Sequence, residues 1–350
     1  MAATVREVAK RAGVSAMTVS RVINGGVGVR PATRGRVEQA IADLDFFPNR
    51  IARGLTSSKT GAIGLIVPDL VNPFFTVVLR GAEMVARRAG YRVLLCNTES
   101  DLTLERSYIE DMMSHRVEGL IVAPVNDNSR LNLSPLMRRG LPFVLIDRGV
   151  PGVDSDLVQA DSAAGARRLM QHLTKIGHRR IAFIIGSDDV STTRERARGY
   201  REGLAAAGIS VEADLVIQTT VDRIGGYRAM QQILRLESRP TAVFAVNNMT
   251  AMGAMETIRE AGLSVPQDIA LVCFDDVEHL AVLSPFMTVV DQPAEKFGTL
   301  AVQLLLERIG GRAGERSRLV VLQPELIVRH SCGVQFRTSR SRSSGAPGVA

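Results

Sequence analysis

Small, hydroxyl-bearing and basic side chains are gathered in a short segment near the amino terminus, at residues 16–21. Groups of these kinds can contact the edges of DNA bases and the phosphate backbone. They alternate with Val19, Val22 and Ile23, whose spacing predicts the buried face of a helix. The exposed face then carries Ala16, Met17, Thr18, Ser20 and Arg21. The segment therefore predicts a DNA-contacting helix, and a helix of an ordinary three-helix bundle is the alternative.

Two further helices are predicted beside this one, with tight turns between the three. Thr4 and Glu7 form a capping-box pattern at the start of the first helix, and Gly13 ends it. Ser15 is the expected cap of the second helix, and Pro31 opens the third. Three short helices with a glycine in the first turn predict a helix-turn-helix, whose second helix would lie in the major groove of DNA.

The distribution of charge supports the same interpretation. Residues 1–60 hold ten Lys and Arg side chains and four acidic ones, a net charge of +6 out of +7 for the whole chain. Such an excess on one segment is typical of a module that binds a polyanion. A solvated surface that only confers solubility is the alternative.

The remaining sequence alternates short apolar runs with helical stretches. The runs that predict strands are AIGLIVP, YRVLLCN, GLIVAP and PFVLID, followed after about residue 160 by IAFIIG, LVIQ, TAVFAVN and IALVCF. Continuous apolar strands separated by helices predict parallel sheets that are covered on both faces. Two rounds of the pattern predict two lobes. The expected fold class is therefore α/β, with an all-α headpiece in front of two doubly wound parallel sheets.

Polar residues that follow these runs are candidates for ligand binding, because open α/β sheets bind ligands beyond the carboxyl ends of their strands. They are Asp69, Asn72, Asn97, Asp147, Arg148, Asn247 and Asp275. The guanidinium group of Arg148 could pair with a carboxylate or a phosphate. These residues predict a small-molecule site in the two-lobed part.

Several classes of protein are disfavoured. Cys96, Cys273 and Cys332 are far apart and odd in number, so neither a disulfide framework nor a metal site is expected. We find no apolar stretch of the length of a membrane span or signal peptide, and we expect a cytoplasmic protein. The sequence has no phosphate-binding loop, GxSxG or HExxH motif, so we expect neither an enzyme nor a cofactor. A transporter's ligand receptor would explain two lobes, but not the basic headpiece.

The run VREVAKRAGVSAMTVSRVIN (residues 5–24), with PNRIARGL (48–55) behind it, resembles the headpiece and hinge of the lactose-repressor (LacI) family. The similarity is long, ungapped and placed at the amino terminus. It implies that the base-reading positions are Ala16, Met17 and Arg21. The phosphate-contacting positions it implies are Thr4, Ser15, Thr18, Ser20 and Asn24. The partner is then double-stranded operator DNA, and the bound protein would be associated with the nucleoid.

Residues 49–57 match the hinge helix of this family, which becomes ordered on DNA. The resemblance implies that Asn49, Ala52 and Leu55 contact DNA there, and that Leu55 enters the minor groove. An apolar side chain in that place unstacks a base step and kinks the duplex. A plain flexible linker is the alternative.

The segments GYRAMQQIL (226–234), RPTAVFAVNNMTAMGAM (239–255) and GLSVPQDIALVCFDD (262–276) resemble the periplasmic-binding-protein-like sensor of the same family. The similarity is greatest to purine-repressor-like and sugar-sensing members. It implies three crossings between the lobes. The first lobe would comprise residues 61–160 and 291–322, and the second 161–290 and 323–330. The whole chain would then divide into a headpiece (1–48), a hinge (49–60), a sensor (61–332) and a disordered tail (333–350).

The resemblance also implies which residues contact the effector. They are Asn72, Phe74, Phe75, Asp147, Arg196, Asn247 and Asp275, and Arg148 joins them as a residue at a strand end. Each has a simpler alternative. The phenylalanines could belong to the core, Arg196 could lie on a solvated helix face, and Asp275 could cap a helix.

Four positions depart from the family pattern. Arg30 replaces a frequent capping serine, Cys273 a glycine and Asn248 an aspartate, while Val221 replaces an aromatic ring that stacks on the ligand. The expected effector is a sugar, a sugar acid or a related metabolite, bound between the lobes. The tail lacks leucine heptads, so we expect a homodimer rather than a tetramer. Whether the effector releases the operator-bound protein or recruits it stays open.

Overall fold

The computed structural model describes residues 3–23, 28–46, 60–276 and 286–334. The chain divides into two compact units, Met1–Thr60 and Gly61–Ala350. Among the residues described, no helix combines the length and the apolar character needed to cross a membrane.

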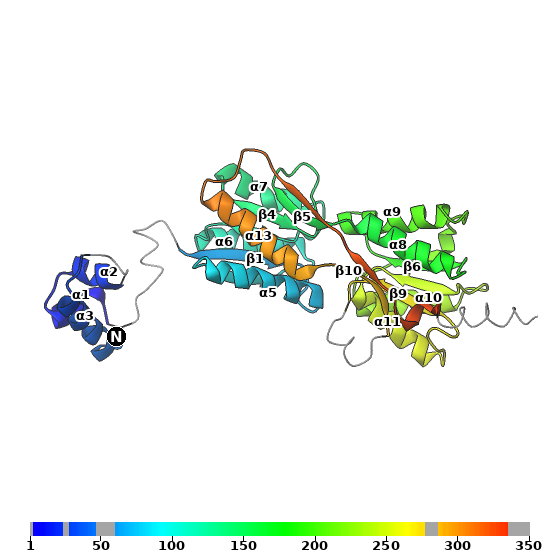
Figure 1. Ribbon diagram of the computed structural model, residues 1–350, viewed down its shortest axis with the longest axis horizontal. Helices are drawn as coiled ribbons and strands as arrows, with labels where there is room; N and C mark the ends of the chain where they lie inside the picture. The colour runs from blue at the N-terminus through cyan, green and yellow to red at the C-terminus, as the bar shows by residue number, and fades with distance from the viewer. Residues whose placement is uncertain (1–2, 24–27, 47–59, 277–285, 335–350) are drawn as a thin grey trace, which may run out of the picture. The chain divides into compact units, whose positions relative to one another are not determined.

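In the described residues 3–23 and 28–46 of the first unit the chain forms three helices, which Figure 1 labels: α1 (Val5–Ala12), α2 (Ala16–Ile23) and α3 (Pro31–Asp43). Val8, Val19 and Val37, one from each helix, are fully buried in a common core. The predicted capping box is confirmed, because Thr4 Oγ1 accepts from the Glu7 amide at 3.3 Å and the Glu7 carboxylate accepts from the Thr4 amide at 2.7 Å. The apolar spacing of the sequence therefore predicts the core of this unit correctly.

Arg30 stands immediately before α3, where a capping serine is frequent in the family. Its side chain makes no capping hydrogen bond to the start of this helix. Pro31 occupies the first turn, as predicted. Because proline has no backbone N–H, the first turn of α3 has one fewer N–H group that needs a capping acceptor.

The first lobe of the second unit contains a six-stranded sheet in the order β11-β5-β4-β3-β1-β2, with all neighbours parallel. The strands are β1 (Ala62–Val67), β2 (Arg92–Asn97), β3 (Leu120–Val122), β4 (Phe143–Ile146), β5 (Asp156–Ala160) and β11 (Leu319–Leu322). One face packs against α5 (Pro73–Arg88) and α13 (Ala294–Ile309), and the other against α6 (Leu102–Ser114) and α7 (Ser129–Arg139). Within β1, Leu65 belongs to the first core and Ile66 to the second. Burial on both faces explains the continuous apolar run.

The second lobe repeats this arrangement with the order β12-β10-β9-β8-β6-β7. Its strands are β6 (Ile181–Ile185), β7 (Val216–Gln218), β8 (Ala242–Ala245), β9 (Ala270–Phe274), β10 (Thr288–Asp291) and β12 (Glu325–Ile327). Helices α8 (Ser162–Lys175) and α9 (Ser191–Ala205) cover one face, and α10 (Arg223–Leu234) and α11 (Asn248–Glu260) cover the other. Short 3-10 turns occur at Ala213–Leu215 and His330–Cys332. Only β12 runs antiparallel to its neighbour among the described strands.

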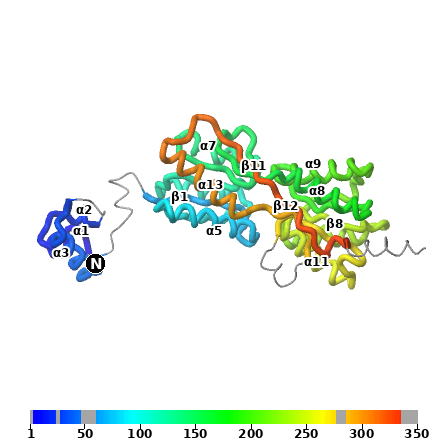
Figure 2. The backbone as a smooth tube through the Cα atoms, in the orientation of Figure 1, coloured from blue at the N-terminus to red at the C-terminus, as the bar shows by residue number. Residues whose placement is uncertain are grey.

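The chain passes between the lobes three times, from β5 to α8, from β10 to α13, and from β11 to β12. Figure 2 shows the last of these passages as the segment coloured orange to red, which runs across both lobes. Each lobe is thus assembled from separate parts of the sequence. The expected fold class, a helical headpiece followed by two parallel-rich sheets, is confirmed.

The eight strands predicted from apolar runs are present as β1 to β4 and β6 to β9. Of the strands in the described ranges, four escaped prediction: β5, β10, β11 and β12. β5 has the sequence DLVQA, with alternating burial and too few apolar residues to form a run. β11 lies at a sheet edge, and its Leu319 is 60 % exposed. Strands of these kinds gain their stability from pairing partners that are distant in the sequence.

Asp156, at the start of β5, holds together three separate segments of the first lobe. Its fully buried carboxylate accepts from Arg308 of α13 at 2.7 and 3.1 Å, and from Arg318 beside β11 at 2.7 Å. It also accepts from the Arg318 backbone amide at 2.8 Å. Arg318 in turn pairs with Glu307. Hydrogen-bonded, paired charges can be buried at a tolerable cost, whereas removal of one partner leaves the others uncompensated.

Asp156→Asn should lower the free energy of unfolding at pH 7 by about 2–3 kcal/mol, because two guanidinium groups lose their shared counter-charge. Burial alone would raise the pKa of Asp156, but hydrogen bonds from Arg308 and Arg318 outweigh it and lower the pKa to about 2. The carboxylate therefore stabilises the fold above the pKa of an unfolded aspartate, ~3.9, and this contribution is lost as the pH falls from there toward 2. Urea unfolding should show a smaller difference in the free energy of unfolding between wild type and variant at about pH 3 than at pH 7.

The matched control is Asp154→Asn, which alters a neighbouring exposed carboxylate that accepts from Ser317. This change should cost less than about 0.5 kcal/mol. If both variants lose the same free energy of unfolding, the buried ion pairs of Asp156 stabilise the fold no more than an exposed carboxylate does.

Candidate functional site

A cavity of about 760 Å³ opens between the two lobes, where the strands of both sheets end. All eight residues predicted to contact an effector line it: Asn72, Phe74, Phe75, Asp147, Arg148, Arg196, Asn247 and Asp275. Asp69 and Asn97, the other polar residues noted at strand ends, line it too. The structure thus gathers the predicted residues around one space. Their contact with an effector stays a prediction.

Asp147 and Asp275 occupy equivalent places in the two lobes. Asp147 follows β4 and Asp275 follows β9, each the third strand in the order of its sheet. Both have a left-handed backbone, with φ of 65° and 67°, which is strained for residues with a side chain. Both side chains are buried, at 7 % and 5 % exposed. Strained, buried carboxylates on either side of one cavity are typical of a binding site.

Arg196 of α9 is 6 % exposed, so the alternative of a solvated helix face is wrong. Its guanidinium donates to the Val246 carbonyl at 2.6 Å, lies 3.8 Å from the Asp275 carboxylate and stacks 3.9 Å from the centre of the Phe274 ring. Burial raises the pKa of Asp275, while the charge of Arg196 and a 2.5 Å hydrogen bond from Gln292 oppose the rise. Arg196, Asp275 and Gln292 therefore form one connected polar cluster at the wall of the cavity.

Arg148 is also engaged by its own lobe. It donates to the carbonyls of Pro124 and Val125, both at 3.0 Å, and lies 3.3 Å from the Asp147 carboxylate. Burial lowers the pKa of Arg148, and the neighbouring carboxylate of Asp147 opposes this shift. The guanidinium therefore orders the loops after β3 and β4, which both end at the cavity.

Asn72 and Asn247 begin helices at the edge of the cavity. Asn72 caps α5 by accepting from the Phe74 amide at 3.0 Å, and Asn247 caps α11 by accepting from the Thr250 amide at 2.9 Å. The positive ends of both helix dipoles therefore point toward the cavity side of their lobes. Each amide has a capping role in addition to the predicted contact with a ligand.

Phe74 and Phe75 are both core and cavity residues. They are 6 % and 2 % exposed and pack edge to face at 5.0 Å, and Phe74 packs in the same way on Phe297 at 5.3 Å. Their position in the core of the first lobe agrees with the simpler alternative, yet both also line the cavity. The two interpretations are compatible, because the core extends up to the cavity wall.

Further polar residues line the cavity that the sequence reasoning missed. They are Glu99, Ser100, Asn126, Ser187, Asp189, Thr192, Thr193, Gln218, Thr219, Thr220, Asp222 and Gln292. Gln218 ends β7 and the two threonines follow it, so the strand-end rule that found Asp147 would have found them. Gln292 follows β10, a strand that escaped prediction. Val221 lies where an aromatic ring is frequent in the family, and it is 37 % exposed.

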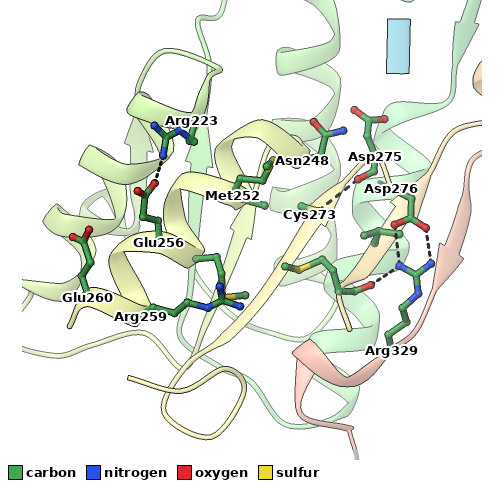
Figure 3. Close-up of a pocket in the computed structure, with 14 residues that line it drawn as sticks. Arg223, Asn248, Met252, Glu256, Arg259, Glu260, Cys273, Asp275, Asp276 and Arg329 are labelled. Carbon is green, nitrogen blue, oxygen red and sulfur yellow. Dashed lines mark hydrogen bonds and ion pairs between the residues drawn. The ribbon is translucent and has the colours of Figure 1, made fainter. Parts of the chain in front are cut away.

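A second cavity, of about 540 Å³, lies within the second lobe (Figure 3). Its apolar wall includes Met252, Met255 and Cys273. At its edges Arg223 pairs with Glu256 at 2.6 Å, and Asp276 accepts from Arg329 at 2.9 Å (Figure 3). These charged groups already satisfy one another, and the cavity draws on one lobe only. Converging polar groups from both lobes distinguish the larger cavity as the candidate effector site.

The exposed side of α2 carries the residues predicted to read bases. Met17 is 67 % exposed and Ala16, Ser20 and Arg21 are exposed, whereas Val19 and Val22 are buried against the other helices. Asn24, Asn49, Ala52 and Leu55 lie outside the described residues. The arrangement of α2 leaves a surface of the predicted composition free to approach DNA.

The hydroxyl groups predicted to contact phosphates also hold the starts of helices. Ser15 Oγ accepts from the Thr18 amide at 3.2 Å and lies 3.0 Å from Thr18 Oγ1. The Thr4 hydroxyl donates to the Glu7 carboxylate at 2.9 Å. Thr4, Ser15 and Thr18 therefore lie at the amino ends of α1 and α2, where free amides and the helix dipole favour a phosphate.

Comparison with known proteins agrees with this geometry. Residues 4–49 match the model of bacterial regulatory proteins of the lacI family, and residues 170–332 match that of the periplasmic binding protein-like domain. The HTH-type transcriptional repressor PurR of Photobacterium profundum is 36 % identical over 330 residues, which cover 94 % of this chain and 98 % of the relative. The ribose operon repressor of Escherichia coli is 36 % identical over 331 residues, covering 94 % and 99 %. A lac repressor dimer bound to operator and the anti-inducer ONPF has 27 % identity and a TM-score of 0.82, over 95 % of this chain and 99 % of its own.

Arg21→Ala should relax the base preference at one position of each half-site, with a loss of discrimination of about 1–3 kcal/mol, because the planar guanidinium can bind both acceptors of a guanine. Thr18→Ala should weaken binding to all sequences alike, since its hydroxyl is assigned to a phosphate. Selection from a library of randomised half-sites, followed by sequencing, measures both. Arg6→Ala, on the exposed side of α1, is the charge-matched control. If the Arg21 and Thr18 variants show the same selectivity profile, the assignment of α2 to the bases is wrong.

Proposed function

The chain belongs to the LacI family of bacterial regulatory proteins, and from this premise we propose how its parts divide the work of a transcriptional repressor. Residues 1–48 bind operator DNA through α2, residues 49–60 form the hinge, and residues 61–332 sense a small-molecule effector. The effector binds in the 760 Å³ cavity between the lobes. The role is binding rather than catalysis, exercised in the cytoplasm at the nucleoid.

Two chains bind a near-palindromic operator, one headpiece to each half-site. A single helix-turn-helix per chain buries little DNA surface, and two-fold proteins read two-fold sites. The lac repressor dimer bound to operator, which resembles this chain along 95 % of its length, supports the same assembly.

The effector class follows from one observation, the excess of carboxylates around the cavity. Among the described residues, six carboxylates line it, against the two guanidinium groups of Arg148 and Arg196. The carboxylates are those of Asp69, Glu99, Asp147, Asp189, Asp222 and Asp275. Carboxylates accept hydrogen bonds from hydroxyl groups and repel anions. The best-supported effector is therefore an uncharged, hydroxyl-rich molecule of the size of a sugar.

From the sequence, Arg148 and Arg196 suggested a sugar acid or a phosphorylated sugar. In the structure such an anion fits less well than a neutral sugar. Both guanidinium groups already bond to carbonyls of their own lobe and lie beside Asp147 and Asp275. They are thus largely neutralised before a ligand arrives. The similarity to PurR keeps a purine base as the second candidate. Val221 argues against it, because no aromatic ring stands at that position to stack on a flat base.

Thermal unfolding of the full-length protein in the presence of D-ribose, other neutral aldoses, their aldonic acids and hypoxanthine tests this assignment. A ligand at 100 times its Kd stabilises the fold by about 2.7 kcal/mol, so a specific effector is easily seen. We expect a shift with a neutral sugar and none with the matching acid. A shift with the aldonic acid alone would overturn the proposed effector class.

Arg196→Ala should abolish the response of operator binding to the neutral sugar found in this way, while operator binding without sugar stays nearly unchanged. Asp275 would lose its buried counter-charge, and a coupling of about 1–3 kcal/mol between the two ligands would disappear. Operator titrations with and without sugar measure it.

Two further variants give this titration its controls. Arg198→Ala, on the exposed side of the same helix, should keep the full response. Leu55→Ala should do the reverse of Arg196→Ala and weaken operator binding while sugar binding persists. An Arg196→Ala protein that responds at wild-type sugar concentrations would remove Arg196 from the site.

A further inference from the structure

The two lobes touch one another along one flank of the effector cavity. The loop after β3 reaches the loop between β6 and α9, where the Asp127 amide donates to the Asp189 carbonyl at 2.9 Å and Asn126 Nδ2 donates to the Asp189 carboxylate at 2.8 Å. Beside them the Gly149 amide donates to Ser191 Oγ at 3.2 Å. Each of these hydrogen bonds joins one lobe to the other.

An ion pair reinforces this contact. Arg194 of α9 donates to both oxygens of Asp127, at 2.8 and 3.2 Å, in a bidentate arrangement. The same guanidinium donates to the Asp188 carbonyl of its own lobe at 2.6 Å, so it is held in place on its own side. The side chains of Arg194 and Asp127 are 38 % and 31 % exposed, which leaves the pair partly screened by water. A bidentate, pre-oriented pair is stronger than an ordinary surface ion pair, whose contribution is small.

The lobes also approach one another where the loop after β1 meets the segment after β8, and this second contact is much weaker. In the common strand order, β8 corresponds to β3 and β1 corresponds to β6. Among the described residues, a single hydrogen bond joins the loop after β1 to the start of α11 after β8: Asn248 Nδ2 donates to Asn72 Oδ1 at 3.3 Å. The buried Oδ1 of Asn248 has no hydrogen-bond partner among the residues described. In the part of the chain that the structure describes, the two lobes are therefore joined unequally, by an ion pair on one side and by a single amide hydrogen bond on the other.

The charged contact also forms part of the cavity wall. Asn126 and Thr193 line the cavity, and they are the sequence neighbours of Asp127 and Arg194. Separation of Asp127 from Arg194 would move both loops, and with them polar groups that face the ligand. The ion pair therefore acts on the cavity without touching its contents.

We propose that Asp127 and Arg194 are positioning residues of the effector site, whose inter-lobe ion pair sets the share of molecules with the cavity closed. The inference rests on the proposed effector site. Because an effector held by both lobes binds the closed form, its apparent Kd rises as the closed fraction falls. The pair thus tunes effector sensitivity, and the Asn72–Asn248 side is where the lobes part first.

Hydrogen exchange of the full-length protein, without DNA or effector, tests the pair directly. Among the described residues, the amides of Asp127 and Gly149 donate to Asp189 and Ser191 of the other lobe, so their exchange reports opening of the lobes. In Arg194→Gln both should exchange about three- to tenfold faster than in the wild type, a loss typical of a good ion pair. Mass spectrometry with fragmentation to single residues measures them. The Asp147 amide donates to the Val158 carbonyl within one lobe at 2.9 Å. Its exchange rate should stay at the wild-type value, whereas unfolding of the lobe would raise it.

Arg198→Gln is the matched control, because Arg198 lies on the same helix and pairs only with Glu195 and Glu202 of its own lobe among the residues described. It should leave both inter-lobe amides at wild-type rates. The exchanged pair Asp127→Arg with Arg194→Asp should restore protection, and 1 M NaCl should speed exchange in the wild type but not in Arg194→Gln. Wild-type exchange at both amides in Arg194→Gln would overturn the proposal. Because this measurement needs no effector, that failure is distinct from the absence of a sugar response, which would count against the proposed function.

Discussion

The parallel direction of the strands is the constraint on which the rest of the structure depends. Parallel neighbours must be joined by crossover connections, so helices cover both faces of each sheet and the carboxyl ends of the strands meet at one edge. In this chain two such edges face one cavity. Asp147 and Asp275 come together because they follow equivalent strands in two lobes, although 127 residues lie between them. The strand topology therefore determines where the site lies, and the side chains at the strand ends determine its chemistry.

Buried charge is handled in two ways in the second unit. Asp156 is saturated by hydrogen bonds from two arginines and joins segments of the first lobe. At the cavity, by contrast, Arg196 lies 3.8 Å from Asp275, and Arg196 Nε and Gln292 Oε1 are buried with no hydrogen-bond partner in the part of the chain described. The fully hydrogen-bonded carboxylate of Asp156 serves the architecture of the first lobe, whereas Arg196 and Gln292 keep buried polar atoms at the cavity wall that a ligand can complete.

Three passages of the chain between the lobes limit how the sensor can move. A lobe joined to its neighbour at three points rotates about them rather than separating, as in hinge closure around a ligand. In the sequence the headpiece precedes β1 of the first lobe, whereas the second lobe begins with α8. Contacts such as Asp127 with Arg194 add to the covalent passages, and they can be broken and remade. A reversible contact of modest strength is suited to shifting a population between two arrangements.

The sequence by itself determined the three helices of the headpiece, eight strands and the residues around the cavity. It could do so because helical spacing, apolar runs and strand ends are local properties of a chain. The resemblance to a family contributed Phe74, Phe75 and Arg196, which no local rule selects. Only the tertiary structure decided that Arg196 is buried rather than solvated, that each arginine lies beside a carboxylate of its own lobe, and that Gln292 and Asp189 reach the cavity. It also decided the strands β5, β10, β11 and β12 and the inter-lobe pair of Asp127 and Arg194. These features depend on partners that are far away in the sequence, and no pattern within a short segment records where such a partner will lie.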